Sequence, residues 1–289
     1  MNGPAGIIWL ASFPKSGNTW FRALIANLDA GEGEPADIND LSGRGGIASS
    51  RQEFEAVTML DSALLSDDDI DRLRPEVYAH IAAQLTEPRW IKAHDAYALN
   101  ADGVPTLGRG VARRAVYLVR DPRDVAVSYS HHASCTLDEA VEMLNTEAWT
   151  MAGQKRGMAV QLRQRLLGWS GHAASWLDQT DTPVHLVRYE DMRADPAGVF
   201  AAALAFAERA ATPEAVARAV RHADFAELKR QESEKGFRER QAPSSPFFRA
   251  GRVGGWREAL TQEQVARIEA THGPMMQRLG YALSLSDAA

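Results

Sequence analysis

Residues 12–28, SFPKSGNTWFRALIANL, could bind a phosphate group at the turn between a strand and a helix. The apolar run IIWLA precedes this stretch, and an amphipathic helical pattern follows it. Such a strand–turn–helix unit points free backbone N–H groups and the positive end of the helix at an anion. A plain turn in which Gly17 opens a helix would show the same pattern. On this stretch alone, phosphate binding and that structural interpretation both stay open.

The spacing of this turn differs from that of the ATP- or GTP-binding loop, G-x-x-x-x-G-K-[ST]. Lys15 lies two residues before Gly17 instead of directly after a second glycine, and Pro14 stiffens the turn. This turn is therefore not an ATP- or GTP-binding loop of that type, and a phosphate would bind here to a loop with different spacing.

A second candidate anion site follows the apolar run that ends at Arg120, in YLVRDPRDVAVSYSHH. If a helix begins near Pro122, Ser128 lies in its second turn, on a face that could look back toward Arg120. The alternative is a solvated cluster of caps and ion pairs within residues 120–124.

Length, charge and cysteine content limit the classes of protein to consider. The 289 residues fit one large α/β domain or two small ones, and we find no linker. The formal net charge of −6 argues against a general nucleic-acid binder, and we expect no nucleic-acid partner. Cys135 is the single cysteine, so no intrachain disulfide forms. Neither a signal peptide nor a membrane span is recognisable, and we expect a cytoplasmic protein with no membrane partner.

The hydrophobic pattern predicts strands that alternate with helices. The predicted strands are residues 7–12, 89–94, 115–120 and 184–189. The predicted helices start near Ser66 and Pro122 and cover residues 136–151, 158–179, 196–209, 213–221 and 262–279. Residues 30–58 and 233–255 are rich in Gly, Ser and Pro, and no element is predicted there. This pattern predicts an α/β fold with a mainly parallel sheet, helices on both faces and ligands at the carboxyl ends of the strands.

Five segments, in their order and spacing, resemble the PAPS-dependent sulfotransferases over nearly the whole chain. They are SFPKSGNTW, RWIKAHDAY, AVYLVRDPRDVAVSYSHH, LVRYEDM and FFRAGRVGGWREALT. The resemblance implies a single sulfotransferase domain over residues 1–289 with a P-loop-like nucleotide-binding core. It also implies transfer of a sulfuryl group from 3′-phosphoadenosine 5′-phosphosulfate (PAPS) to a hydroxyl, or an amine, of a small molecule. The start IIWLASFPKSGNTW is most similar to bacterial enzymes that sulfate natural products.

The resemblance also implies which residues bind the cofactor. The 5′-phosphosulfate would lie on Lys15, Ser16, Gly17, Asn18 and Thr19. The 3′-phosphate would lie on Arg120 and Ser128, with Arg249 and the backbone at Gly251 closing on it. The adenine would lie against Trp20, Phe225 and Tyr189. For Trp20 and Phe225, core packing is the alternative that the residues themselves leave open.

For catalysis, the resemblance makes His94 the general base, because its imidazole can accept the proton of an acceptor hydroxyl near neutral pH. A lone histidine is more often structural, but His94 follows Lys92 by two residues at a strand end. Lys92 would steady the sulfuryl oxygens, and Lys15 would offset charge on the bridging oxygen. Asp95 is the nearest alternative base. We expect no metal, since no histidine pair has metal-ligand spacing.

Four positions depart from the family pattern: Ala93, Ala223, Ala250 and Gly255 stand where many members carry hydroxyl, basic or acidic residues. These departures bear on nucleotide affinity and leave the catalytic residues in place. The C-terminal pattern by which many animal members dimerise is absent, so the oligomeric state stays open.

Variable loops near residues 30–58, 95–110 and 135–157 are expected to form the acceptor pocket. Residues 235–253 are expected to form a lid over the nucleotide. Two other functions remain possible. A nucleotide-dependent kinase would have a similar fold, but its lysine spacing and Mg²⁺ ligands are missing. A non-catalytic nucleotide-binding relative would have no need for both Lys15 and His94.

Overall fold

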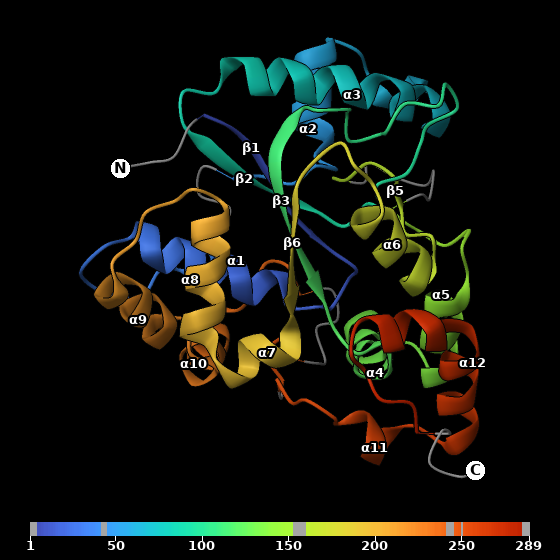
Figure 1. Ribbon diagram of the computed structural model, residues 1–289. Helices are drawn as coiled ribbons and strands as arrows, with labels where there is room; N and C mark the ends of the chain where they lie inside the picture. The colour runs from blue at the N-terminus through green and yellow to red at the C-terminus, as the bar shows by residue number, and fades with distance from the viewer. Residues whose placement is uncertain (1–4, 42–44, 153–159, 241–245, 250, 285–289) are drawn as a thin grey trace.

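The computed structural model describes residues 5–41, 45–152, 160–240, 246–249 and 251–284. A parallel four-stranded sheet with the order β2-β1-β3-β6 runs through it (Figure 1). Its strands are β1 (Gly6–Ser12), β2 (Pro88–Ala93), β3 (Ala112–Val119) and β6 (Val184–Arg188). These are the four strands predicted from the apolar runs, and the predicted α/β fold with a parallel sheet is confirmed.

Helices connect the strands, as parallel neighbours require. They are α1 (Asn18–Asp29), α2 (Arg51–Thr58), α3 (Asp67–Gln84), α4 (Pro122–Ala133), α5 (Leu137–Asn145), α6 (Gly168–Leu177), α7 (Tyr189–Ala194), α8 (Pro196–Phe206), α9 (Pro213–His222), α10 (Phe225–Lys235), α11 (Trp256–Ala259) and α12 (Gln262–Arg278). Two 3₁₀ turns, η1 (Ile38–Asp40) and η2 (Ser62–Leu64), and the short pair β4 (Thr150–Met151) and β5 (Gln164–Arg165) complete the described elements.

Alternation along the strands divides the buried side chains between the two faces of the sheet. Trp9 of β1 and Tyr117 of β3 face a core closed by α3, α5, α6 and α12. Leu10 and Leu118, one residue further along each strand, face a second core closed by α1, α8 and α9. Figure 1 shows these two sets of helices on opposite sides of the sheet.

The predicted start near Ser66 is confirmed, because the Ser66 side chain accepts the Asp69 N–H in a capping box at the start of α3. The prediction that residues 30–58 contain no helix or strand is wrong. Residues 51–58 form α2, in which the Ser50 side chain accepts the Glu53 N–H and Phe54 is buried. The glycines and serines around this short helix hid its pattern. Part of that range, residues 42–44, lies outside the described residues.

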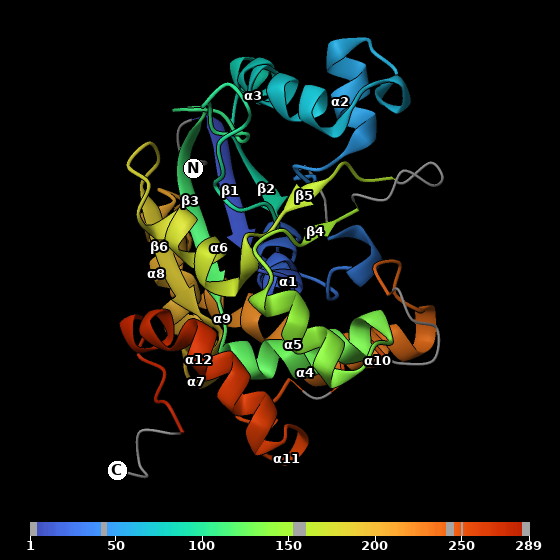
Figure 2. The same ribbon diagram turned by 90° about the vertical axis from the view of Figure 1, so that its right-hand side faces the viewer.

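Two predicted helices are too long. The one predicted for residues 136–151 ends at Asn145, and residues 150–151 form β4, which pairs with β5 as an antiparallel ladder. The one predicted for residues 158–179 begins only at Gly168. Leu167 and Gly168 have φ of 59° and 64°, a left-handed conformation that no helix interior adopts. Figure 2 shows β4 and β5 between α2 and α3 on one side and α4 and α5 on the other.

Residues 233–255 were also predicted to contain no helix or strand, but this segment begins within a helix, since α10 extends to Lys235. Gly236, with φ of 71°, ends that helix. The predicted lid over residues 235–253 lies partly outside the described residues, at 241–245 and 250. Its described aromatic side chains pack together: Phe237 contacts Phe247 and Phe248.

Candidate active site

A cavity of about 930 Å³ opens at the carboxyl ends of β1, β2 and β3. This is the edge where the parallel sheet was predicted to bind ligands. The predicted site residues that line it are Lys15, Gly17, Asn18, Thr19, Trp20, Lys92, His94, Arg120, Ser128, Tyr189, Phe225, Arg249 and Gly251. Ser16 lies in the same loop, but its side chain is buried beneath the cavity wall.

The loop between β1 and α1 has free donors for an anion. Gly17, which has no side chain, occupies the N-cap position of α1 with φ of 102°. A Cβ at this position would lie 2.8 Å from the Tyr189 ring, so the turn requires glycine. The buried Ser16 hydroxyl has no hydrogen-bond partner among the described residues. The loop therefore fits a phosphate or phosphosulfate group that would accept these donors.

Asn18 and Thr19 stabilise this loop through their side chains. The Asn18 amide nitrogen donates to the Leu10 carbonyl at 3.0 Å and to the Ser12 hydroxyl at 3.2 Å, which ties α1 to β1. The Thr19 hydroxyl accepts a hydrogen bond from Arg22 at 3.2 Å. The Asn18 amide is thus used within the protein, whereas the Thr19 hydroxyl, which accepts here, still has its O–H to donate.

Lys15 is a cation within this loop. Its ammonium lies 3.9 Å from the centre of the Phe247 ring. Burial, together with the positive charges of Arg120 and Lys92, lowers the pKa of Lys15 to about 7. An anion bound beside Lys15 would restore its proton.

The His94 ring is held in one tautomer. Its Nδ1 lies 2.9 Å from the Ser12 carbonyl oxygen, which can only accept, so Nδ1 carries the proton and Nε2 has a free lone pair. Burial and the nearby Lys92 charge shift the pKa of His94 well below its ordinary value, and the ring is neutral at pH 7. His172 fixes the backbone here, because its Nε2 donates to the His94 carbonyl at 3.1 Å. His94 is thus in the form that a general base requires.

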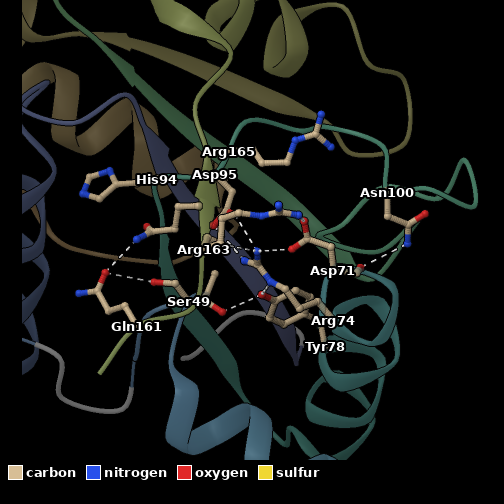
Figure 3. A network of polar contacts seen from close by, with 12 residues as sticks. Ser49, Asp71, Arg74, Tyr78, His94, Asp95, Asn100, Gln161, Arg163 and Arg165 are labelled. Atoms are coloured by element: carbon tan, nitrogen blue, oxygen red, sulfur yellow. Dashed lines mark hydrogen bonds and ion pairs between the residues drawn. The ribbon is translucent and has the colours of Figure 1, made fainter. Parts of the chain in front are cut away.

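Asp95, the alternative base, is occupied by a buried arginine. Both of its carboxylate oxygens accept from Arg74, at 2.8 and 2.9 Å, and Arg74 is 1% exposed. In Figure 3 the His94 ring and the Arg74 side chain lie on opposite sides of Asp95. Arg74 also donates to the Tyr78 hydroxyl and to the Arg163 carbonyl, and the Tyr78 hydroxyl donates to the carbonyl of Ala48. Asp95 is therefore a structural residue.

Arg120 lines the cavity at the carboxyl end of β3. Its guanidinium donates to the Arg252 carbonyl at 2.8 Å and to the Lys15 carbonyl at 3.3 Å, and it lies 4.4 Å from the centre of the Tyr189 ring. Its buried Nε has no hydrogen-bond partner in the part of the chain that the structure describes. Ser128 lines the cavity from the second turn of α4, where it was predicted. This end fits a second anion.

Aromatic side chains also line the cavity. The Trp20 indole N–H donates to the Ala223 carbonyl at 3.0 Å, and Arg193 lies 5.5 Å from the centre of that ring. Phe225 begins α10, and a Cβ at Gly251 would come within 3.0 Å of its ring. Trp20 and Phe225 both line the cavity and also pack against a hydrophobic core.

Residues 6–280 match the family model described as the sulfotransferase domain. The chain belongs to the sulfotransferase family. It is 26% identical over 283 residues to cytosolic sulfotransferase 13 of Arabidopsis thaliana. The aligned region covers 91% of this chain and 75% of the relative. It is 21% identical over 276 residues to luciferin sulfotransferase of Photinus pyralis, with 91% and 69% covered.

Two solved structures have the same fold. Retinol dehydratase, in complex with androsterone and the inactive cofactor PAP, superposes with a TM-score of 0.59 at 22% identity, over 94% of this chain and 80% of that one. The sulfotransferase domain of the Synechococcus PCC 7002 olefin synthase superposes with a TM-score of 0.51 at 16% identity, over 98% and 97%. These likenesses support the sulfotransferase fold that the five sequence segments predicted.

Sequence reasoning missed the acidic residues of this sulfotransferase site. Asp124 accepts the backbone N–H groups of Gly254 and Trp256, at 2.7 and 3.0 Å, and so positions the loop that contains Gly255. Glu239 accepts from Lys92, the lysine predicted to steady the sulfuryl group. The only sequence signal for Glu239 was its place in the segment predicted as a lid. Ala250, one of the noted departures, lies outside the described residues.

Arg249 is exposed at the cavity mouth. Across residues 5–284, apart from the segments left undescribed, no three His, Cys, Asp or Glu side chains gather in a group that could hold a metal ion. None of the helices in the described ranges combines the length and the apolar character that crossing a membrane would take.

Proposed function

We propose that this chain transfers a sulfuryl group from PAPS to a hydroxyl, or an amine, of a small molecule, with His94 as the general base. The observation that carries the proposal is the neutral His94 ring, with Nε2 free, in the same cavity as the anion-binding loop after β1. Membership of the sulfotransferase family supports the reaction class.

The cavity suits a donor with two separated anionic groups. In our proposal the loop of residues 15–19 binds the 5′ group, and Arg120 with Ser128 binds the 3′-phosphate. The unpartnered Arg120 Nε supports this assignment, because a bound anion could accept its N–H. Bound PAPS would supply an activated sulfuryl group. Retinol dehydratase and the mouse sulfotransferase SULT7A1 were both crystallised with PAP.

The protein's own residues then have separate tasks. Nε2 of His94 accepts the proton of the acceptor hydroxyl as its oxygen attacks, and the Ser12 carbonyl supports the resulting imidazolium through Nδ1–H. Lys15 offsets negative charge that develops on the leaving phosphate oxygen, and Lys92 offsets charge on the sulfuryl oxygens. Positioning and electrostatic stabilisation supply most of the rate, by analogy with phosphoryl transfer.

The acceptor would lie on the His94 side of the cavity, against a largely apolar wall. Ile47, Met151, Val160 and Phe247 line the cavity, together with the amide of Gln161. Of the three predicted acceptor loops, residues 30–58 and 135–157 contribute to the described lining, and residues 95–110 do not. We propose a bacterial natural product or metabolite as the acceptor, supported by the resemblance of the segment IIWLASFPKSGNTW. The relatives named cytosolic sulfotransferases support a cytoplasmic location.

Ligand-induced melting shifts test the donor. Adenosine 3′,5′-bisphosphate (PAP) without metal should raise the melting temperature, whereas ATP with Mg²⁺ should raise that of a kinase. Stabilisation by ATP·Mg²⁺ and none by PAP would contradict the proposal. Incubation with PAPS and a panel of phenols, alcohols and amines, followed by mass spectrometry, then identifies acceptors by the gain of one sulfuryl group. Firm PAP binding with no transfer to any of them would favour the non-catalytic alternative.

A further inference from the structure

Glu239 places a carboxylate inside the proposed cofactor cavity, beside the lysine assigned to the sulfuryl group. It follows α10, and it lines the cavity together with Lys92 and Arg22. Its two carboxylate oxygens accept from Arg22 at 2.8 and 2.7 Å, and one of them lies 3.3 Å from the Lys92 ammonium. An anion of the protein itself therefore already contacts Lys92.

This carboxylate is ionised at every pH at which the protein would work. Burial opposes its ionisation, but Lys92 and Arg22 outweigh burial and lower the pKa of Glu239 to about 2. The Lys92 side chain is 13% exposed, and a buried ammonium needs a counter-ion. Glu239 supplies that counter-ion when no sulfuryl group is near.

The two cations hold Glu239 unequally. Arg22 makes two short hydrogen bonds to it and a third to the Thr19 hydroxyl, so Arg22 is fixed between the anion-binding loop and Glu239. Lys92 makes a single longer contact through a flexible side chain. If Lys92 turned to another anion, Glu239 would keep both Arg22 bonds and would not be left as an unpaired buried charge.

We propose that Glu239 is an internal anion that holds Lys92 until a sulfuryl group displaces it, and that this exchange makes the site distinguish PAPS from PAP. The inference rests on the proposed function. PAP has no sulfuryl group, so Lys92 keeps its contact with Glu239 when PAP binds. PAPS must draw Lys92 away from Glu239. Glu239 therefore weakens binding of the donor relative to the product.

Calorimetric titration of the Glu239→Gln variant with PAP and with PAPS, in the absence of acceptor, tests the exchange. We expect Glu239→Gln to tighten PAPS binding about tenfold or more, the factor for freeing one charge-assisted hydrogen bond, and to change PAP binding less than about twofold. The matched control is Glu234→Gln, which removes the same charge from an exposed residue that pairs with Arg230. It should change neither affinity. Titration at pH 6.5 keeps Lys92 charged in the unaltered protein, where its pKa is about 8.

Lys92→Met gives a second, independent measurement. In that background Glu239 has no lysine to hold, so adding Glu239→Gln should bring no selective tightening of PAPS binding. Equal effects of Glu239→Gln on PAP and PAPS, or the same selective gain without Lys92, would overturn the inference while leaving the proposed donor intact. Failure of the unaltered protein to bind either nucleotide would overturn both.

Discussion

Binding of PAP should weaken as the pH rises above 7, because Lys15 must be charged to bind the 5′ group. Burial and the positive charges of Arg120 and Lys92 lower the pKa of Lys15 to about 7 in the free protein. A bound anion favours the charged form and raises that pKa, so binding takes up a proton wherever free Lys15 is neutral. Affinity should therefore fall as the pH rises above 7.

The size of the effect follows from the protonated fraction of Lys15. That fraction falls from about one half at pH 7 to about one thirtieth at pH 8.5, so PAP affinity should fall roughly fifteenfold, or about 1.6 kcal/mol. Calorimetry at pH 8.5, in two buffers with different ionisation enthalpies, should show uptake of close to one proton per PAP. Lys15→Arg is the matched variant, since arginine stays charged over this range and should abolish the proton uptake. Equal affinity at both pH values, with no proton uptake, would refute the reasoning.

Three further predictions concern other parts of the site. His94→Ala should lower turnover of an acceptor identified in the screen by about 10²- to 10⁴-fold while PAP affinity stays within about twofold; near-normal turnover would show that another group is the base. Arg120→Ala and Ser128→Ala should each weaken PAP by roughly 1.5 to 3 kcal/mol more than adenosine 5′-phosphate, measured by calorimetry; equal losses would mean that the 3′-phosphate pocket is misplaced. Arg74→Met should lower the free energy of unfolding by about 3 to 5 kcal/mol in urea titrations, because it strands the buried Asp95 carboxylate. Arg72→Met, on an exposed part of the same helix, should cost about 1 kcal/mol or less, and similar costs for both would contradict this account.

The strands and the lining of the cavity could be predicted from the sequence for a local reason. Each strand is a short, mainly apolar run that ends in a polar residue or is followed directly by one, as β3 is by Arg120, and the carboxyl ends of parallel strands meet at one edge. The first turn of α3 was also predictable, because Ser66 and the three aspartates after it form a local cap.

Contacts between residues far apart in the chain could not be predicted from the sequence. Glu239 pairs with Lys92 across 147 positions and with Arg22 across 217, and no periodicity connects them. The buried Arg74 looked like any charged residue of an amphipathic helix. The early end of α5 and the late start of α6 depend on pairing of β4 with β5, which are too short to show alternation.

The cluster of Arg74, Tyr78 and Asp95 bears on how a new acceptor specificity could arise in this fold. Arg74 donates to the Arg163 carbonyl and Tyr78 donates to the Ala48 carbonyl, and neither of these two hydrogen bonds uses the side chain at position 163 or 48. The neighbouring wall residue Ile47 can therefore be exchanged while the frame that carries His94 stays in register. A library randomised at position 47 would then sample new pockets around an unchanged His94.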